Sequence, residues 1–274
     1  MRRWSAVALV LAAVIGCGSF GSSDENGGPG PSQPGGDSGT EASATDASGT
    51  DALLPGDVIA PDGGCKRAIE EHFATELPSP VLWTVDKQGG TVGHSSNEGK
   101  LAAGALSAAV TQSTAGTRAF IERRLEGVPT SATLSFAMRV VPAGAQYLEV
   151  GCTLKFRGAN DTSFAALHPY VINGALYLGS NAKLLSNDFV AGDSEAAVGA
   201  LTPSFWYPVK MTAELITPTT VHFVGSVDDV QKIDKTITLP EPTKDVFVQC
   251  GIDYGDPGES AQVYVDDVVL DACQ

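Results

Sequence analysis

The feature that most constrains the fold is an alternation of apolar and polar side chains with a period of two. Between positions 133 and 140 every second residue is large and apolar, and residues 147–156 repeat the pattern. Successive side chains of a β-strand point to opposite faces, so each segment predicts a strand with one buried face. The intervening residues 141–146 contain proline and glycine and predict a turn. We therefore expect the two strands to pair as a hairpin.

The same alternation recurs along the chain between turn residues such as Gly127-Val128-Pro129. The further strand-like segments are 120–125, 207–215, 221–227, 233–239, 246–252 and 263–270. Residues 101–110 are rich in alanine but fit a strand better than a helix, and residues 69–73 fit either. Many short strands at this spacing predict an all-β fold, an antiparallel β-sandwich.

The N-terminus has the pattern of an export signal. Met1-Arg2-Arg3 is basic, and residues 4–16 are predominantly apolar. This run is shorter than the ~20 residues that a membrane-spanning helix needs, and no other segment reaches that length. We therefore expect a signal peptide over residues 1–16 and no further membrane crossing.

Val14-Ile15-Gly16-Cys17 resembles the lipobox of bacterial lipoproteins, in which the cysteine is acylated and becomes the first residue of the mature protein. The resemblance implies that Cys17 carries a lipid anchor to the bacterial membrane. Gly18 at the next position resembles the sorting pattern for the outer membrane, so an outer-membrane or cell-surface location is expected. The alternative is an ordinary cleaved leader whose nearby cysteine later forms a disulfide.

Residues 17–62 contain Cys17 followed by Gly, Ser, Pro, Ala, Thr and acidic residues, and predict a disordered acidic tether. Residues 63–274 are long enough for one β-sandwich domain with a substantial core. The chain has 17 Lys and Arg against 32 Asp and Glu, a formal charge of −15 that becomes −17 once Arg2 and Arg3 leave with the leader. Such an acidic surface repels phosphate backbones, so nucleic acid is not expected as a partner.

Four cysteines remain once Cys17 is lipidated, and an even number in an exported chain predicts two disulfides. They are Cys65, Cys152, Cys250 and Cys273. Sequence alone does not select among the three possible pairings. Position favours Cys65 with Cys273, which bracket the domain, and Cys152 with Cys250, which both lie in apolar strand-like runs. A zinc site would compete for the cysteines, but the chain has no Cys-x-x-Cys pair.

Three stretches resemble domains of the concanavalin A-like lectin/glucanase superfamily, particularly laminin-G-like jelly rolls. They are "FATELPSPVLWTVDKQGGTV" from residue 73, "LTPSFWYPVKMTAEL" from residue 201 and "VQCGIDYGDPGESAQVYVDDVVLDAC" from residue 248. The resemblance implies a jelly-roll β-sandwich in which the first strand lies beside the last. It therefore also implies that Cys65 and Cys273 come together. The match is one of strands and turns, so it supports the fold better than a function.

Many enzymes of that superfamily are glycoside hydrolases or polysaccharide lyases, and their signatures are absent from this chain. A hydrolase needs two carboxylates ~5–9 Å apart, but the Glu-x-Asp-x-x-Glu run is missing and Glu149 is the only acid on its strand. The lyase pattern Gln-x-His is missing too, and the histidines are scattered along the chain. We therefore predict that the chain is not an enzyme and uses no cofactor.

Acidic residues near the C-terminus leave the question of calcium open. Asp253, Asp256 and Glu259 share a Gly/Pro-rich loop, and Asp266 follows on the last strand-like run. Calcium takes several oxygen ligands from loops of this kind. Acids in tight hairpins are mainly turn formers, so no metal site is predicted.

The expected function is a recognition module that binds a polysaccharide or cell-wall glycan without cleaving it. Sugar sites combine aromatic faces with planar polar groups. The polar face of the predicted hairpin and its neighbours offers such groups. The candidate ligand-binding residues are Arg139, Tyr147, Glu149, Lys155, His222 and Gln249. The first alternative is a structural or protein-binding envelope component with no glycan ligand, and the second is a glycan-active enzyme.

Overall fold

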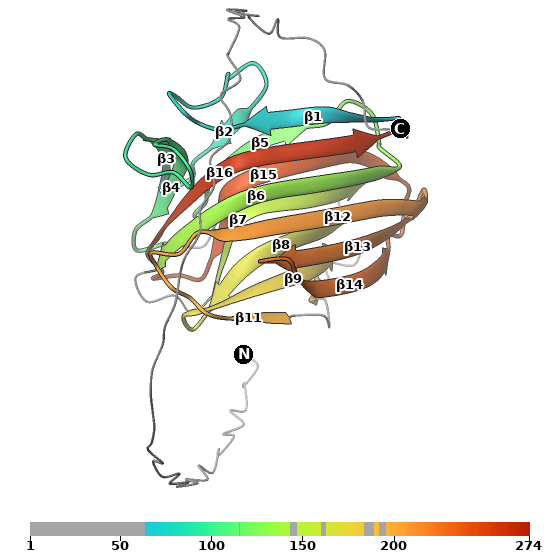
Figure 1. Cartoon of the computed structure of the whole chain (residues 1–274). Coiled ribbons are helices and arrows are strands. Elements are labelled where there is room, and N and C mark those ends of the chain that lie inside the picture. Colours follow the sequence, from blue (N-terminus) through green and yellow to red (C-terminus); the bar gives the residue numbers. More distant parts are fainter. Residues whose placement is uncertain (1–63, 115, 143–146, 160–162, 184–188, 192–195) are drawn as a thin grey trace, which may run out of the picture. The chain divides into compact units, whose positions relative to one another are not determined.

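The protein is an antiparallel β-sandwich whose two sheets form two layers (Figure 1). The computed structural model describes residues 64–274 except 115, 143–146, 160–162, 184–188 and 192–195. The predicted signal peptide, Cys17 and the tether lie outside the described residues. Within the described part of the chain, no helix is long and apolar enough to cross a bilayer.

Sheet A contains eight strands among the described residues, and β16, near the C-terminus, lies near its middle. Its order is β14 (Val230–Thr238), β13 (Thr220–Val227), β12 (Tyr207–Thr217), β6 (Ser131–Pro142), β16 (Ala261–Cys273), β4 (Ala105–Val110) and β3 (Gly90–Ser95), with β1 (Cys65–Glu71) also beside β16. The expected all-β sandwich is therefore present, and residues 65–71 form a strand rather than a helix.

In the described part of the chain sheet B also contains eight strands, and it carries the candidate site. Its order is β10 (Phe189–Ala191), β9 (Ala175–Lys183), β8 (Phe164–Ile172), β7 (Tyr147–Gly158), β15 (Thr243–Gly255), β5 (Ala119–Arg124) and β2 (Thr84–Asp86), with β11 (Ala196–Ala200) also beside β9. Its inner side chains pack against those of sheet A to form one core.

The expected pairing of residues 133–140 with residues 147–156 is wrong. These segments form β6 and β7, but β6 pairs with β12 and β16 in sheet A, whereas β7 pairs with β8 and β15 in sheet B. Their apolar faces meet across the core instead, with Met138 of β6 and Val150 of β7 in the same cluster. The alternation correctly identifies the buried face of each strand, but it carries no information about the strand's hydrogen-bonded neighbour.

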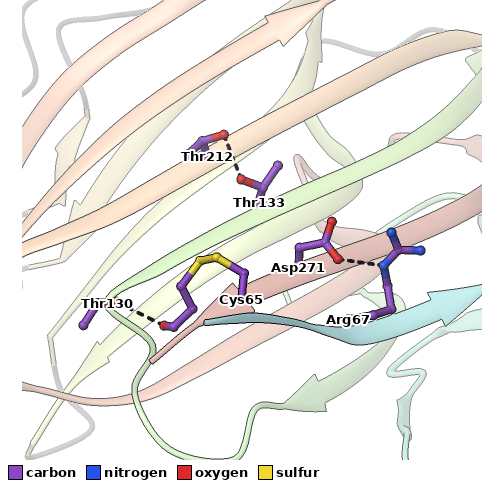
Figure 2. The surroundings of a disulfide bond; sticks show 7 residues. Cys65, Arg67, Thr130, Thr133, Thr212 and Asp271 are labelled. Atoms are coloured by element: carbon purple, nitrogen blue, oxygen red, sulfur yellow. Dashed lines mark hydrogen bonds and ion pairs between the residues drawn. A yellow bond between two sulfur atoms is a disulfide. The ribbon is translucent and has the colours of Figure 1, made fainter. Parts of the chain in front are cut away.

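Both expected disulfides are present. Cys65 is bonded to Cys273 at the ends of β1 and β16, with Arg67 donating to Asp271 (2.7 Å) two residues further along (Figure 2). Cys152 is bonded to Cys250 between paired positions of β7 and β15, and both side chains are fully buried. Two disulfides are typical of a protein that folds in an oxidising compartment, outside the cytosol.

Strand β7 is irregular where it passes beneath the site. Its pairing with β8 is interrupted between Glu149 and Leu154, and Gly151 within this interval has a φ of +81°. A Cβ at Gly151 would lie 2.5 Å from the Sδ atom of Met138 in the facing sheet. Only glycine fits both the left-handed backbone and this close approach. The irregularity shifts the side chains of β7 relative to those of β8.

Candidate functional site

A pocket of about 480 Å³ lies on the face of sheet B that points away from the core. Pocket residues alternate with core residues along β7 and β8, so the geometry that buries Leu148 and Leu167 places Glu149 and His168 in the pocket wall. The lining residues are Tyr147, Glu149, Thr153, Lys155, Phe164, Ala166, His168, Tyr170, Gly179, Ser180, Asn181, Asp253 and Tyr254. A volume of this size suits a small-molecule or sugar ligand.

Part of the pocket is built on a row of directly opposed residues on three neighbouring strands, here named the Lys155–Asn181 row. Lys155 of β7 pairs with Ala166 of β8, and Ala166 pairs with Asn181 of β9. Neighbouring strands are spaced so that the Cα atoms of Lys155 and Asn181 lie roughly 10 Å apart. Ala166 between them has only a methyl group. The row therefore places an ammonium and an amide on either side of an open space.

The Lys155 ammonium is held by its neighbours. It donates to Oε1 of Gln249 at 3.0 Å, lies 3.6 Å from Oδ2 of Asp253 and sits 4.8 Å from the centre of the Phe164 ring. Its side chain is 15% exposed, so the charge is accessible from the pocket but largely shielded from bulk water. A partly desolvated cation attracts an anionic group more strongly than one in open solvent.

Glu149 lies between a tyrosine and a histidine. Its Oε1 accepts a hydrogen bond of 2.8 Å from the Tyr147 hydroxyl. Its Oε2 lies 3.9 Å from Nδ1 of His168, which is longer than a hydrogen bond. His168 itself is 3% exposed and forms part of the pocket wall. A phenol, a carboxylate and an imidazole are thus adjacent in one cavity, a set able to donate and accept protons.

Two polar atoms of the pocket residues have no hydrogen-bond partner among the residues that the structure describes. They are Nδ1 of His168 and Oδ1 of Asn181. A buried polar atom left unpaired costs roughly 1–3 kcal/mol, so such atoms normally have a partner. Both residues line the pocket. The pocket therefore offers a hydrogen-bonding ligand two atoms that the described residues leave unsatisfied.

Tyrosines form one end of the pocket. The ring centres of Tyr147 and Tyr170 are 5.5 Å apart, and Tyr170 stacks on Tyr177 at 5.3 Å with an interplanar angle of 10°. Tyr254 lies 5.8 Å from Tyr147 and is 43% exposed. Partial burial and the nearby charge of Asp256 raise the pKa of Tyr254, so its hydroxyl stays protonated at neutral pH. Aromatic faces of this kind stack on the C–H faces of sugars.

The structure brings most of the predicted ligand-binding residues together. Tyr147, Glu149 and Lys155 line the pocket. Gln249 lies on the neighbouring strand β15 and contacts the pocket through its hydrogen bond to Lys155. These residues belong to the same face of sheet B, as the alternation along β7 and β15 suggests.

Arg139 and His222 do not belong to this group. They lie on β6 and β13 of sheet A, whereas Tyr147, Glu149 and Lys155 lie on β7 of sheet B. Arg139 forms an ion pair with Glu98 at 2.7 Å, and Nε2 of His222 lies 2.9 Å from Oδ1 of Asp234. Their grouping with Tyr147 is therefore wrong: that of Arg139 depended on the hairpin that does not form, and His222 lies on a strand of the other sheet.

Sequence reasoning missed β8 and β9, which supply His168, Tyr170 and Asn181. Strand β8 is buried on both faces over most of its length, so it shows no apolar–polar alternation. Pro169 in its middle also argues against a central strand, and it falls where the ladder to β7 is interrupted. The signal that could have found the pair is Asn173-Gly174, whose φ angles of +49° and +77° suit a two-residue hairpin turn.

The acidic residues considered for calcium have other neighbours. Within the described ranges, no three His, Cys, Asp or Glu side chains are grouped as a metal site. Asp253 faces Lys155, and Asp266 accepts hydrogen bonds from the backbone N–H groups of Lys100 (2.9 Å) and Asp267 (2.8 Å). Burial raises the pKa of Asp266, and these backbone donors partly offset that effect.

No family model matches the sequence, and no curated protein matches it. Solved structures do share the fold. An endo-β-1,4-glucuronan lyase from the fungus Trichoderma reesei superposes with a TM-score of 0.53 at 16% identity, covering 76% of this chain and 96% of that one. An alginate lyase superposes with a TM-score of 0.53 at 11% identity, covering 76% of this chain and 96% of the lyase chain. A carbohydrate esterase from a Shiga toxin-encoding bacteriophage superposes with a TM-score of 0.51 at 15% identity, covering 77% of this chain and 100% of the esterase chain.

These comparisons correct the prediction that the chain is not an enzyme. That prediction rested on missing sequence signatures, whereas the chain has a fold that two polysaccharide lyases also have. The chain thus has the β-sandwich fold of carbohydrate-active proteins, and its chemistry has to be argued from the pocket itself.

Proposed function

We propose that this protein binds an acidic polysaccharide in the sheet B pocket and cleaves it by β-elimination. The observation that carries the proposal is His168, a buried histidine without a hydrogen-bond partner for its Nδ1 among the described residues, in the wall of a pocket that also holds a cation and tyrosines. The lyases that share the fold act, by their names, on glucuronan and alginate, which supports this choice of substrate class.

The Lys155–Asn181 row is the site for the sugar carboxylate. An ammonium and an amide on either side of the small Ala166 provide charge and hydrogen bonds for one carboxylate group. The pocket also contains Glu149 and Asp253, and the Lys155 ammonium, 3.6 Å from Asp253, supplies positive charge that offsets their repulsion of an acidic sugar. Binding the carboxylate there acidifies the adjacent C5–H by stabilising the carbanionic charge that forms when the proton leaves.

The elimination then needs a base and an acid. His168 takes the C5 proton, the C–H electrons form the C4=C5 double bond, and the bond from C4 to the glycosidic oxygen breaks. Tyr147 donates its hydroxyl proton to that leaving oxygen. Glu149 lies between Tyr147 and His168, so it can return the proton from the imidazolium to the phenolate and restore both groups. No water or other reactant is consumed.

The test is cleavage of acidic and neutral polysaccharides by the full chain, followed through the ultraviolet absorbance of the conjugated double bond. We expect product from a uronate polymer only, and a loss of about 10²-fold or more in kcat for His168→Ala, the size typical of removing a general base. His222→Ala is the matched control, since His222 lies on sheet A. Binding without unsaturated product, or full activity in His168→Ala, would contradict the proposal.

We also propose that the protein is an exported lipoprotein anchored through Cys17, at the outer membrane or cell surface. The basic and apolar leader, the lipobox-like residues 14–17 and the two disulfides of the folded domain support it. Cys17→Ser should abolish labelling with a fatty-acid precursor and shift the protein out of the membrane fraction. An unchanged membrane fraction would argue against the anchor. We further place the domain in the concanavalin A-like superfamily, with residues 263–270 as the supporting closing strand.

A further inference from the structure

A chain of hydrogen bonds runs across three adjacent strands of sheet B and ends at Lys155. Glu122 on β5 accepts a hydrogen bond of 2.7 Å from Nε2 of Gln249 on β15, and Oε1 of Gln249 accepts one of 3.0 Å from Lys155 on β7. Gln249 is 5% exposed, so water does not readily replace either partner.

The two residues at the ends of this series of hydrogen bonds, Glu122 and Lys155, determine how the Gln249 amide is oriented. An ionised carboxylate can only accept hydrogen bonds, and an ammonium can only donate them. Glu122 therefore holds the NH₂ group of Gln249, and the amide oxygen must face Lys155. A glutamine with one free end could present either its oxygen or its nitrogen to the lysine. Here only the oxygen is presented, and it holds the ammonium.

We propose that Gln249 is a positioning residue for Lys155, oriented by Glu122, and that it sets the affinity of the pocket for a carboxylate group. The substrate named in this inference rests on the proposed function, whereas the hydrogen bonds from Glu122 to Lys155 do not depend on it. A lysine side chain has many rotamers and must be held in one of them to bind an anion at a defined place. Gln249 supplies that restraint from the neighbouring strand β15, without being one of the residues that line the pocket.

The kinetic test uses Gln249→Leu, Lys155→Met and the double variant in the full chain. We expect Gln249→Leu to raise KM for the acidic polysaccharide about tenfold with kcat nearly unchanged, the size expected for a hydrogen bond to a charged group. In the Lys155→Met background the same substitution should have no further effect on KM, because Gln249 acts through Lys155. Additive effects in the double variant would overturn the inference.

A second readout needs no substrate. An amine-reactive acetylating reagent, mapped by mass spectrometry, should modify Lys155 several-fold faster in Gln249→Leu than in the parent, because the ammonium loses its hydrogen bond to Gln249 and keeps only its contacts with Asp253 and Phe164. An unchanged rate at Lys155 would overturn the positioning role. Faster labelling together with no cleavage of any polysaccharide would leave the positioning role standing and contradict the proposed function instead.

Glu122→Gln tests the same positioning role if the Gln249→Leu variant fails to fold. A neutral amide at position 122 can either donate or accept, so Gln249 would no longer be restricted to one orientation. We expect Glu122→Gln to raise the labelling rate of Lys155 in the same direction and by less than Gln249→Leu. No change at Lys155 in this variant would show that Glu122 does not orient the amide.

Discussion

Lys155 on β7 and Asn181 on β9 face the same space in the sheet B pocket, with only the methyl group of Ala166 on the strand between them. The spacing of strands in a sheet makes this gap wide enough for a carboxylate and its hydrogen bonds. The size of residue 166 therefore decides what the row can hold.

Replacing Ala166 with Leu should fill the gap between Lys155 and Asn181. We expect at least about a tenfold loss of affinity for an acidic oligosaccharide, measured by calorimetry, because a leucine side chain excludes the carboxylate from the row. Ala102→Leu, at an exposed loop position, is the control and should bind normally. Unchanged binding by Ala166→Leu would mean that the carboxylate is held elsewhere.

Replacing Gly151 with Ala should destabilise the fold more than the same change at Gly174. Both glycines have positive φ, +81° and +77°, so both variants pay for a left-handed alanine. At Gly174 the new Cβ meets open space, whereas at Gly151 it lies 2.5 Å from Met138 Sδ. Chemical denaturation should therefore show an additional loss of about 1–3 kcal/mol for Gly151→Ala, the usual cost of overpacking. Equal losses would show that the core relaxes around the added methyl.

Removing the buried disulfide by the double change Cys152→Ala and Cys250→Ala should lower the free energy of unfolding by about 2–5 kcal/mol. The bond closes a segment with a sequence separation of 98 residues, so the unfolded chain gains much conformational freedom without it. Thermal melts of the oxidised parent and the double variant measure the difference. Identical melting temperatures would contradict the prediction.

His72 should make stability depend on pH. A hydrogen bond to Asp267, assisted by Glu70, raises the pKa of His72 above its ordinary value of 6.5. The folded state therefore binds the proton more tightly than the unfolded state, and the resulting stabilisation is complete below pH 6.5 and lost as pH rises through the raised pKa. His72→Asn should thus cost more stability at about pH 5 than at about pH 8, because only the lower pH lies below the ordinary pKa of 6.5.

Asp267→Asn is the control for this effect, since it removes the partner that raises the pKa of His72 most. In that background the pH dependence of the His72→Asn difference should shrink. A stability difference that is the same at both pH values in the parent chain would show that His72 does not titrate differently in the folded and unfolded states.

The sequence by itself determined which face of most strands is buried, and the positions of the cysteines favoured the pairing that forms. Leu134 and Leu148 lie in the core because the period of two marks them as inward-facing, and Cys65 and Cys273 meet because the first and last strands are neighbours. It also identified Tyr147, Glu149 and Lys155, since their strand β7 alternates clearly. These are local properties, or properties of the ends of the chain, and can be read from the order of residues.

Only the tertiary structure decided which strands are neighbours, and through this it decided the site. Arg139 fits the predicted polar face as well as Lys155 does. It lies on the other sheet, because β6 and β7 are on opposite sides of the core. His168 and Asn181 were missed because β8 and β9 lack a clear alternation. The Lys155–Asn181 row joins residues that are 26 positions apart in the chain. Strand pairing depends on contacts between distant parts of the chain and on the packing of the whole core. A period of two in the sequence does not show which strands pair.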